Sequence, residues 1–258
     1  MAGSFSFDGV NLSTKGLGLL APLSKEILTP SRSATVEVLG KPGAYAFPQR
    51  FTLRRFNLDC YVQGDSHSDL LSKLQEIASL LNPQKGLKQL LFDTQTDRYY
   101  LAKVSKTMVG RIKALDADVA VDFVVPDPFP FSTSESSYAQ DLTSNPQTYS
   151  FGVGGDAQAV PVYTLTAQAA DAAVTATLSS DTRGEAIVWK GSLAIGNTLE
   201  IDCDQWVVKK NGAVDMANVS GEFPVLNPGS NQFTMSGFPI SGSSPYSTIN
   251  HVWRNRYL

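Results

Sequence analysis

Two histidines are the first residues to test for catalysis, because imidazole can act as a general base and as a metal ligand near neutral pH. His67 stands between Ser66 and Ser68, where a helix is expected to begin, and His251 lies in an expected strand near the end of the sequence. Neither has a nucleophile or a second metal ligand at the spacing of a catalytic triad or a zinc site. We expect His67 to be exposed beside a helix cap and His251 to be structural.

Paired carboxylates are the second candidate, because glycosidases built on β-sandwiches use two acidic side chains. Asp116 and Asp118, and likewise Asp202 and Asp204, are two positions apart, which puts both members of each pair on one face of a strand. Asp204 is followed by Gln205, where a turn is expected. Asp116 and Asp118 belong to a longer acidic face that we expect to be solvated or to contact a partner. Neither pair predicts hydrolysis.

The remaining motifs predict no cofactor and no metal. Cys60 and Cys203 are far apart and belong to no CxxC or Cys/His cluster, so we expect them to pack in β cores. The sequence contains no GxSxG, HExxH, phosphate-binding lysine loop, dinucleotide-binding glycine pattern or D-x-D-x-D-G calcium loop. These features predict a protein that is not an enzyme.

Composition restricts the class of protein further. The 258 residues suggest two domains, and a charged fraction of 17% beside an apolar fraction of 42% favours a folded, β-rich chain over a disordered one. Lys and Arg number 21 against 24 Asp and Glu, giving a net charge of -3, which argues against tight binding of nucleic acid. No apolar run is long enough for a membrane helix, and the first residues do not resemble a signal peptide. We expect synthesis in the cytoplasm and no membrane insertion.

One helix is expected to support the first half. Apolar residues recur at helical spacing over 68–81, Asp69 suits the positive end of the helix dipole, and Asn82-Pro83 ends the pattern. Strands are expected over 34–39, 51–62, 87–93, 99–106 and 112–125. The apolar residues of the strand over 51–62 move from odd to even positions near Arg54 and Arg55. Such a change predicts a β-bulge inside this strand.

The second half is expected to consist of strands and turns. Residues 126–150 begin with three prolines in five residues and continue as a polar stretch, so we interpret them as a hinge with at most one short strand at 147–151. Eight short strands are expected beyond it: 161–167, 174–179, 185–189, 198–202, 206–211, 222–226, 232–236 and 247–254. Asn211-Gly212 is the strongest hairpin signal. Their spacing is typical of a sandwich or jelly roll.

Opposite charges in the first half form the candidate interaction site. A basic cluster near the start of one strand and an acidic face on another could meet across the interface of a cyclic assembly, which joins two different faces of one protomer. Complementary charges would set the register of that contact. An ordinary solvated face with a pair inside one chain is the alternative. The candidate interface residues are Arg50, Arg54, Arg55, Asp116, Asp118 and Asp122.

The order of these parts resembles the distal tail protein family of siphophages. In the first half the resemblance rests on the start FSFDGV (5–10), the turn LGKPG (39–43), the helix, the hairpin over 90–104 and the exit DPF (127–129). In the second half it rests on residues 191–202, the turn KNG (210–212), the stretch GEFPVLNPGSN (221–231) and the ending WRNRYL (253–258). These are structural turns rather than catalytic residues.

The resemblance implies a mainly β protein of two domains. Residues 1–130 would form a β-sandwich-like ring domain with one α-helix, and residues 131–258 a galectin-like β-sandwich of jelly-roll type. Six copies would form a ring whose channel lets DNA pass without specific binding. Tail tube protein would dock on one side and the tail hub or fibre protein on the other, with receptor-binding proteins carried outside, at the virion tail tip. The sequence shows no long inserted arm.

The alternative function is a carbohydrate-binding β-sandwich module that contacts the host cell surface. A sugar site normally needs an exposed aromatic platform with polar neighbours. Trp189 and Trp206 are the candidates in the second half, and both lie in strand patterns, so we expect them in the core or at an interface.

Overall fold

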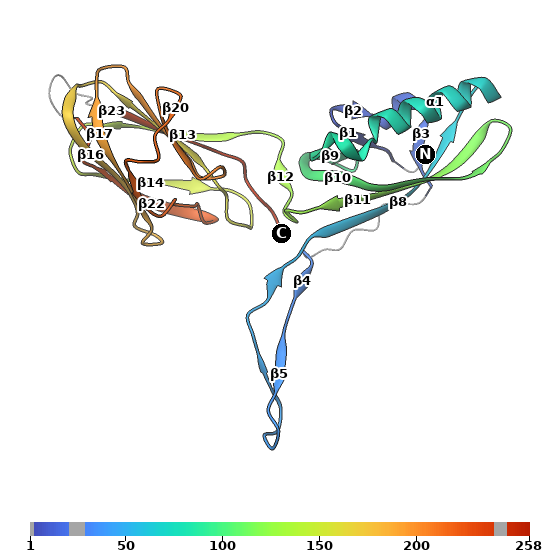
Figure 1. The fold of residues 1–258 in the computed structure, drawn as a ribbon, viewed down its shortest axis with the longest axis horizontal. Coiled ribbons are helices and arrows are strands. Elements are labelled where there is room, and N and C mark those ends of the chain that lie inside the picture. Colours follow the sequence, from blue (N-terminus) through green and yellow to red (C-terminus); the bar gives the residue numbers. More distant parts are fainter. Residues whose placement is uncertain (1–2, 21–28, 240–246) are drawn as a thin grey trace. The chain divides into compact units, whose positions relative to one another are not determined.

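A computed structural model describes residues 3–20, 29–239 and 247–258. The chain divides into two compact units, one formed by Met1–Thr133 with Leu258 and the other by Ser134–Tyr257 (Figure 1). The first contains an α-helix, and in the described part of the second there is none. The expected mainly β fold with one α-helix is therefore confirmed.

The first unit is built on a single eight-stranded sheet. Its strands follow the order β2-β1-β9-β10-β11-β8-β3, with β12 attached to β10. The sheet curls until its β3 end reaches the residues just before β1, where Leu19 N donates to Gly3 O (3.3 Å). The bounds are β1 (Phe5–Phe7), β2 (Val10–Asn11), β3 (Leu17–Leu19), β8 (Arg54–Gln63), β9 (Lys88–Phe92), β10 (Gln95–Ile112), β11 (Asp116–Val125) and β12 (Phe131–Ser132), with short 3-10 helices at Leu12–Lys15 and Pro83–Lys85.

Buried and more exposed side chains alternate strictly along β8 and β11, and the buried ones form the core of this unit. On β11 every second residue from Ala117 to Val125 is buried, and its cross-strand partners on β8, such as Phe56 opposite Phe123, are buried as well. Phe123 also contacts Phe5 edge-on, with ring centroids 5.7 Å apart. The inner face is therefore largely apolar, and apart from Arg54, the first residue of β8, the charged residues of both strands lie on the outer face.

The helix α1 (His67–Leu80) covers part of that core, as its apolar spacing predicts. Leu70 and Ile77 are buried, whereas Leu71 of the same expected stripe is about half exposed (47%). Ser66 begins the helix, because its Oγ accepts the amide of Asp69 at 3.1 Å. This bond satisfies one of the amides that the first turn leaves without a helical partner.

Residues 31–51 form a two-stranded ribbon that we call the arm. Its strands pair only with one another: β4 (Ser31–Arg32) with β7 (Arg50–Phe51), and β5 (Thr35–Glu37) with β6 (Ala44–Ala46). Each pair is a separate two-stranded sheet. Every residue of the arm from 31 to 51 is exposed. The sequence predicts the strand and turn here, but not an arm.

The expected bulge near Arg54 and Arg55 is wrong. β7 ends at Phe51, residues 52 and 53 lie in no strand, and β8 then alternates without interruption from Arg54 to Gln63. The change of parity therefore marks the passage of the chain from the arm into the sheet. Because β8 begins in this register, Arg54 points to the buried face and Arg55 to the outer face.

The second unit is a sandwich of two antiparallel sheets that share one core. The six-stranded sheet has the order β13-β23-β15-β18-β19-β20 and the five-stranded sheet β14-β22-β16-β17-β21. Trp189 and Phe233 from one sheet and Tyr163 and Ile249 from the other belong to the same buried cluster. The bounds are β13 (Ser136–Leu142), β14 (Gln147–Val153), β15 (Val162–Ala167), β16 (Asp171–Ser180), β17 (Ala186–Leu193), β18 (Thr198–Asp202), β19 (Val207–Lys210), β20 (Ala213–Val214), β21 (Val219–Gly221), β22 (Gly229–Ser236) and β23 (Ser247–Trp253).

Two expectations for this half are corrected. The polar stretch interpreted as a hinge contains β13 and β14, which form the edges of the two sheets, where Ser, Thr and Gln can face water. Residues 222–226 form no strand, and β21 ends just before them. The hairpin at Asn211-Gly212 is confirmed, since both residues have positive φ (50° and 79°) and join β19 to β20.

We predict that Ser66→Ala destabilises α1 by about 1 kcal/mol, because the amide of Asp69 loses its acceptor. Hydrogen exchange of the α1 amides should accelerate by about five-fold, which corresponds to that free energy. Ser68→Ala is the matched control, since Ser68 lies one residue inside the helix and its hydroxyl is not the cap. Equal exchange rates in the two variants would contradict the assignment of the cap.

Candidate functional site

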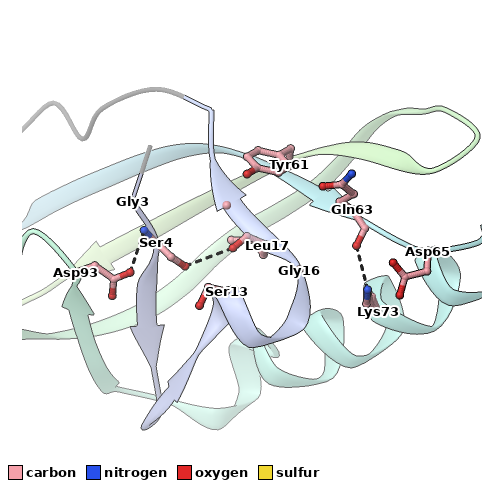
Figure 2. Close-up of a pocket in the computed structure, with 11 residues that line it drawn as sticks. Gly3, Ser4, Ser13, Gly16, Leu17, Tyr61, Gln63, Asp65, Lys73 and Asp93 are labelled. Carbon is pink, nitrogen blue, oxygen red and sulfur yellow. Dashed lines mark hydrogen bonds between the residues drawn. The ribbon is translucent and has the colours of Figure 1, made fainter. Parts of the chain in front are cut away.

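A pocket of about 410 Å³ in the first unit is the first place to look for chemistry (Figure 2). It lies where residues 3–4 approach residues 16–18, with Lys73 and Asp93 in its wall. Lys73 Nζ is 2.8 Å from the Asp69 carboxylate and donates to Gln63 O at 3.1 Å. The hydrogen bond with Asp69 raises the pKa of Lys73 and lowers that of Asp69. The ammonium group therefore stays protonated and is a poor base or nucleophile.

Asp93 in the same pocket is also used structurally. One of its oxygens accepts the amide of Ser4 (3.1 Å) and the other accepts Asn11 Nδ2 (3.2 Å). These bonds tie the start of the chain to the end of β9. Among the described lining residues there is no nucleophile beside a general base. The pocket is lined by main-chain atoms and by Lys73, which Asp69 holds in an ion pair. Its described lining residues form no catalytic set.

The two histidines lie as expected. His67 is exposed at the start of α1. His251 is buried in the sandwich, where its Nε2 is 2.9 Å from Tyr149 OH. Its ring lies 4.7 Å from the ring of Phe151 and 4.9 Å from that of Tyr163 between centroids. Burial lowers the pKa of His251 to about 3, so the imidazole is neutral at physiological pH and acts as a core residue.

Carboxylates and cysteines form no reactive site. Asp202 Oδ1 accepts the amides of Asp204 (3.0 Å) and Gln205 (2.9 Å), so it shapes a turn. Both cysteines are buried and free, and burial raises the pKa of the Cys60 thiol to about 12. Across the described residues there is no group of three or more His, Cys, Asp or Glu side chains that could hold a metal. No helix in this described part is long and apolar enough to cross a membrane.

The three predicted arginines lie in different environments. Arg50 is exposed at the base of the arm, and Arg55 is exposed on the outer face of β8. Arg54 is only 4% exposed, and it donates to Tyr100 OH (2.9 Å) and Thr29 Oγ1 (3.3 Å). Arg54 therefore holds the start of β8 from inside and cannot reach a neighbouring protein from there.

The three predicted aspartates share the outer face of β11. Asp118 lies opposite Tyr61 on β8, and Asp122 lies opposite Asn57. Asp116 forms an ion pair with Lys113 at 2.9 Å. Arg55 lies opposite Val124 of β11. Val124 and Asp122 are two residues apart and share one face, so Arg55 and Asp122 are diagonal neighbours on the outer face. The structure thus places Arg55 beside the acidic residues of its own sheet and leaves Arg50 on the arm.

The arm contains functional candidates that the sequence analysis did not identify. Tyr45 and Phe47 are each 53% exposed, and Val36, Leu39 and Phe51 are exposed beside them. Val36 lies opposite Tyr45 across the pair of strands. A hairpin with large apolar side chains and no second layer is not stable by itself in water. The alternation of apolar residues over 34–39 was the available signal, but it does not say which molecule covers them.

Comparisons with known proteins identify the family. A model of the phage tail protein RIFT-related domain matches residues 10–123, and a model of the siphovirus-type tail component C-terminal domain matches residues 154–257. The chain belongs to the siphophage distal tail protein family. Together the two matches cover most of the chain, with one family domain on each compact unit.

Solved structures agree on the fold. The Dit protein of phage SPP1, described as a paradigm of the hub adsorption apparatus of phages that infect Gram-positive bacteria, matches with a TM-score of 0.80 at 15% identity over 100% of both chains. A chain of the phage P2 baseplate in its activated conformation with calcium matches with a TM-score of 0.54 at 9% identity over 98% of both chains. No curated protein sequence matches significantly.

These findings confirm the expected function as a structural component of the siphophage tail tip. They place the chain in the virion tail, among proteins that assemble with other tail proteins. The galectin-like sandwich of the second unit belongs to the same family fold. The alternative of a carbohydrate-binding module is not favoured by any of these matches.

We predict that His251 makes stability fall in acid. The lowered pKa means that the unfolded chain binds one more proton than the folded chain between pH 6.5 and about 3. Folding stability is therefore highest above pH 6.5 and declines by up to about 1.4 kcal/mol per pH unit as the pH falls through this window. His251→Phe keeps an aromatic ring without the proton, so its stability should decline less steeply in chemical denaturation between pH 6.5 and 4.

The control for this measurement is His67→Gln, which removes the other histidine at an exposed position. We expect the His67→Gln curve to follow that of the unsubstituted protein. Parallel pH curves for His251→Phe and the unsubstituted protein would show that the buried imidazole does not set the slope.

Proposed function

We propose that this chain is a ring subunit of the tail tip that works by contacting copies of itself. The first domain, 1–130, forms a homo-hexameric ring, and the second, 131–258, is carried outside it. The observation that supports this proposal is the arm, whose large apolar side chains remain about half exposed or more although Phe51 contacts Phe129 and Lys41 lies over the Tyr45 ring. A second copy of the chain is the partner that is always present at equal concentration.

Charge complementarity supports contact between the arm of one copy and the outer face of β11 on the next. The arm carries Arg32, Lys41 and Arg50 against a single Glu37. The outer face of β8 and β11 carries Asp59, Asp116, Asp118 and Asp122, with Arg55 at one end. Lys106 of β10 lies opposite Asp122, and Lys113 pairs with Asp116. Asp59 and Asp118 are therefore the carboxylates of this face without a cation directly opposite them. A contact between two different surfaces of one protomer closes into a ring when the rotation between neighbours divides a full turn.

A ring subunit of the tail tip also contacts other tail proteins. We infer that one face of the ring docks the tail tube protein and the other the tail hub or fibre protein, and that the second domain can carry receptor-binding proteins. DNA passes through the channel without specific binding, which agrees with the net charge of -3. The chain performs no reaction and uses no cofactor. It is made in the host cytoplasm before joining the virion.

We predict that Arg50→Glu weakens self-assembly by about ten-fold in dissociation constant, because a charge on the arm then repels the acidic face. Asp118→Arg should weaken assembly similarly, and the double substitution should restore part of it. Light scattering after size-exclusion chromatography measures the mass over a range of concentrations, and negative-stain images show whether an annulus forms. The series must include high protein concentrations, because subunits associate into rings by mass action.

Lys190→Glu is the control, since it reverses a charge on the exposed face of β17 in the other unit. Unchanged assembly in both Arg50→Glu and a variant whose arm residues 35–46 are replaced by a short glycine-serine turn would overturn the arm contact. A strict monomer at every concentration in the unsubstituted chain would overturn the ring.

A further inference from the structure

The second unit carries one large aromatic side chain that its core does not use. Trp206 is 71% exposed, whereas Trp189 and Trp253 are buried. It lies in the turn between β18 and β19, directly after the residues that Asp202 caps. The strand pattern over 206–211 predicts Trp206 in a strand, in the core or at an interface. The structure places Trp206 outside both the strands and the core.

The backbone at Trp206 is in the left-handed region, with φ of 55°. Glycine and asparagine adopt this conformation readily, as Gly212 and Asn211 do in the next turn, but for a bulky side chain it is strained. The turn does not require an indole ring for its own stability. Strain that is held in place at an exposed residue points to a role outside the fold.

Other apolar side chains extend the indole into a surface. The Phe223 ring lies 6.1 Å from the Trp206 ring between centroids, and Phe223 itself packs against the core. Met216 is exposed, and its sulfur accepts the amide of Val208 at 3.2 Å, which fixes it beside the first residues of β19. Trp206 and Phe223 thus form an aromatic platform, and Met216 adds an exposed thioether beside Val208 near the start of β19, two residues along the chain from Trp206.

The charged residues that adjoin Trp206 and Phe223 most closely in the sequence are acidic. Asp204 precedes Trp206 by two residues, Glu222 adjoins Phe223, and both are exposed. No described lysine or arginine forms an ion pair with either carboxylate. The nearest lysine on β19, Lys209, is held by Glu200 at 2.7 Å. We call Trp206, Phe223, Met216, Asp204 and Glu222 the Trp206 patch.

We propose that the Trp206 patch binds an arginine- or lysine-bearing segment of another protein. An indole face attracts a cation through its quadrupole, and carboxylates without cationic partners add Coulomb attraction. Trp and Met are also enriched where proteins bind one another. A sugar fits less well, because Asp202 is used by the turn and the Gln205 amide donates to Asp204 at 3.2 Å. This site lies on the second unit and does not depend on the proposed ring.

The test uses the full chain labelled with fluorotryptophan, which gives one fluorine resonance for each of the three tryptophans. The probe is the capped peptide Gly-Arg-Gly-Arg-Gly, with Gly-Gln-Gly-Gln-Gly as the neutral peptide and chitotriose as the sugar. Trp206→Phe assigns the resonance of Trp206. We expect the arginine peptide alone to shift that resonance saturably, with binding at least five-fold weaker in 0.5 M salt.

Variants separate recognition from folding. Asp204→Asn and Glu222→Gln should each weaken binding at least two-fold, whereas Asp156→Asn, another exposed aspartate of this unit, should leave it unchanged. Trp206→Gly should abolish binding while keeping or raising the melting temperature, because glycine suits the positive φ.

Three results would overturn the proposal. One is a shift of the Trp206 resonance by chitotriose and not by the arginine peptide. Another is no shift with any probe. The third is equal binding of the arginine peptide to Asp204→Asn, Glu222→Gln and Asp156→Asn.

Discussion

An apolar strand surface must be covered, and this constraint governs the whole molecule. The sandwich of the second unit meets it by stacking two sheets around Trp189 and Phe233. The first unit meets it by curling one sheet until β3 reaches the residues just before β1 and by laying α1 over the remaining opening. The arm does not meet it within the described chain, since Tyr45 and Phe47 lie on a ribbon of only two strands. In the proposed assembly, another copy of the chain supplies the second layer over these side chains.

Much of the fold could be read from the sequence wherever burial inside the chain decides the pattern. The spacing of Leu70 and Ile77 predicts α1, the alternation from Ala117 to Val125 predicts β11, and Asn211-Gly212 predicts its hairpin. The polar edge strands β13 and β14 could not be predicted in the same way. One face of an edge strand can be polar, so its residues resemble those of a linker.

The candidate site was predictable only in part, because parity depends on where a strand begins. Arg54 and Arg55 are adjacent and chemically equal, yet the first residue of β8 sends one to Tyr100 in the interior and the other to solvent. The sequence gives both residues the same charge, but it does not show which one is buried and which one is exposed. The three aspartates of β11 were placed correctly on one outer face because ten alternating residues fix their parity. Trp206 was expected in a strand, but it lies exposed in a turn with a left-handed backbone, which no periodicity in the sequence indicates.

The most direct test of the account is hydrogen exchange of the arm as a function of protein concentration. If the arm is covered by another copy, the amides of β5 and β6 should exchange slowly at concentrations where assemblies form and rapidly after dilution to monomers. The amides of β23 in the sandwich core should exchange equally slowly in both samples. Rapid exchange of β5 and β6 inside a fully formed assembly would contradict the central claim, because the arm would then lie uncovered in the working state.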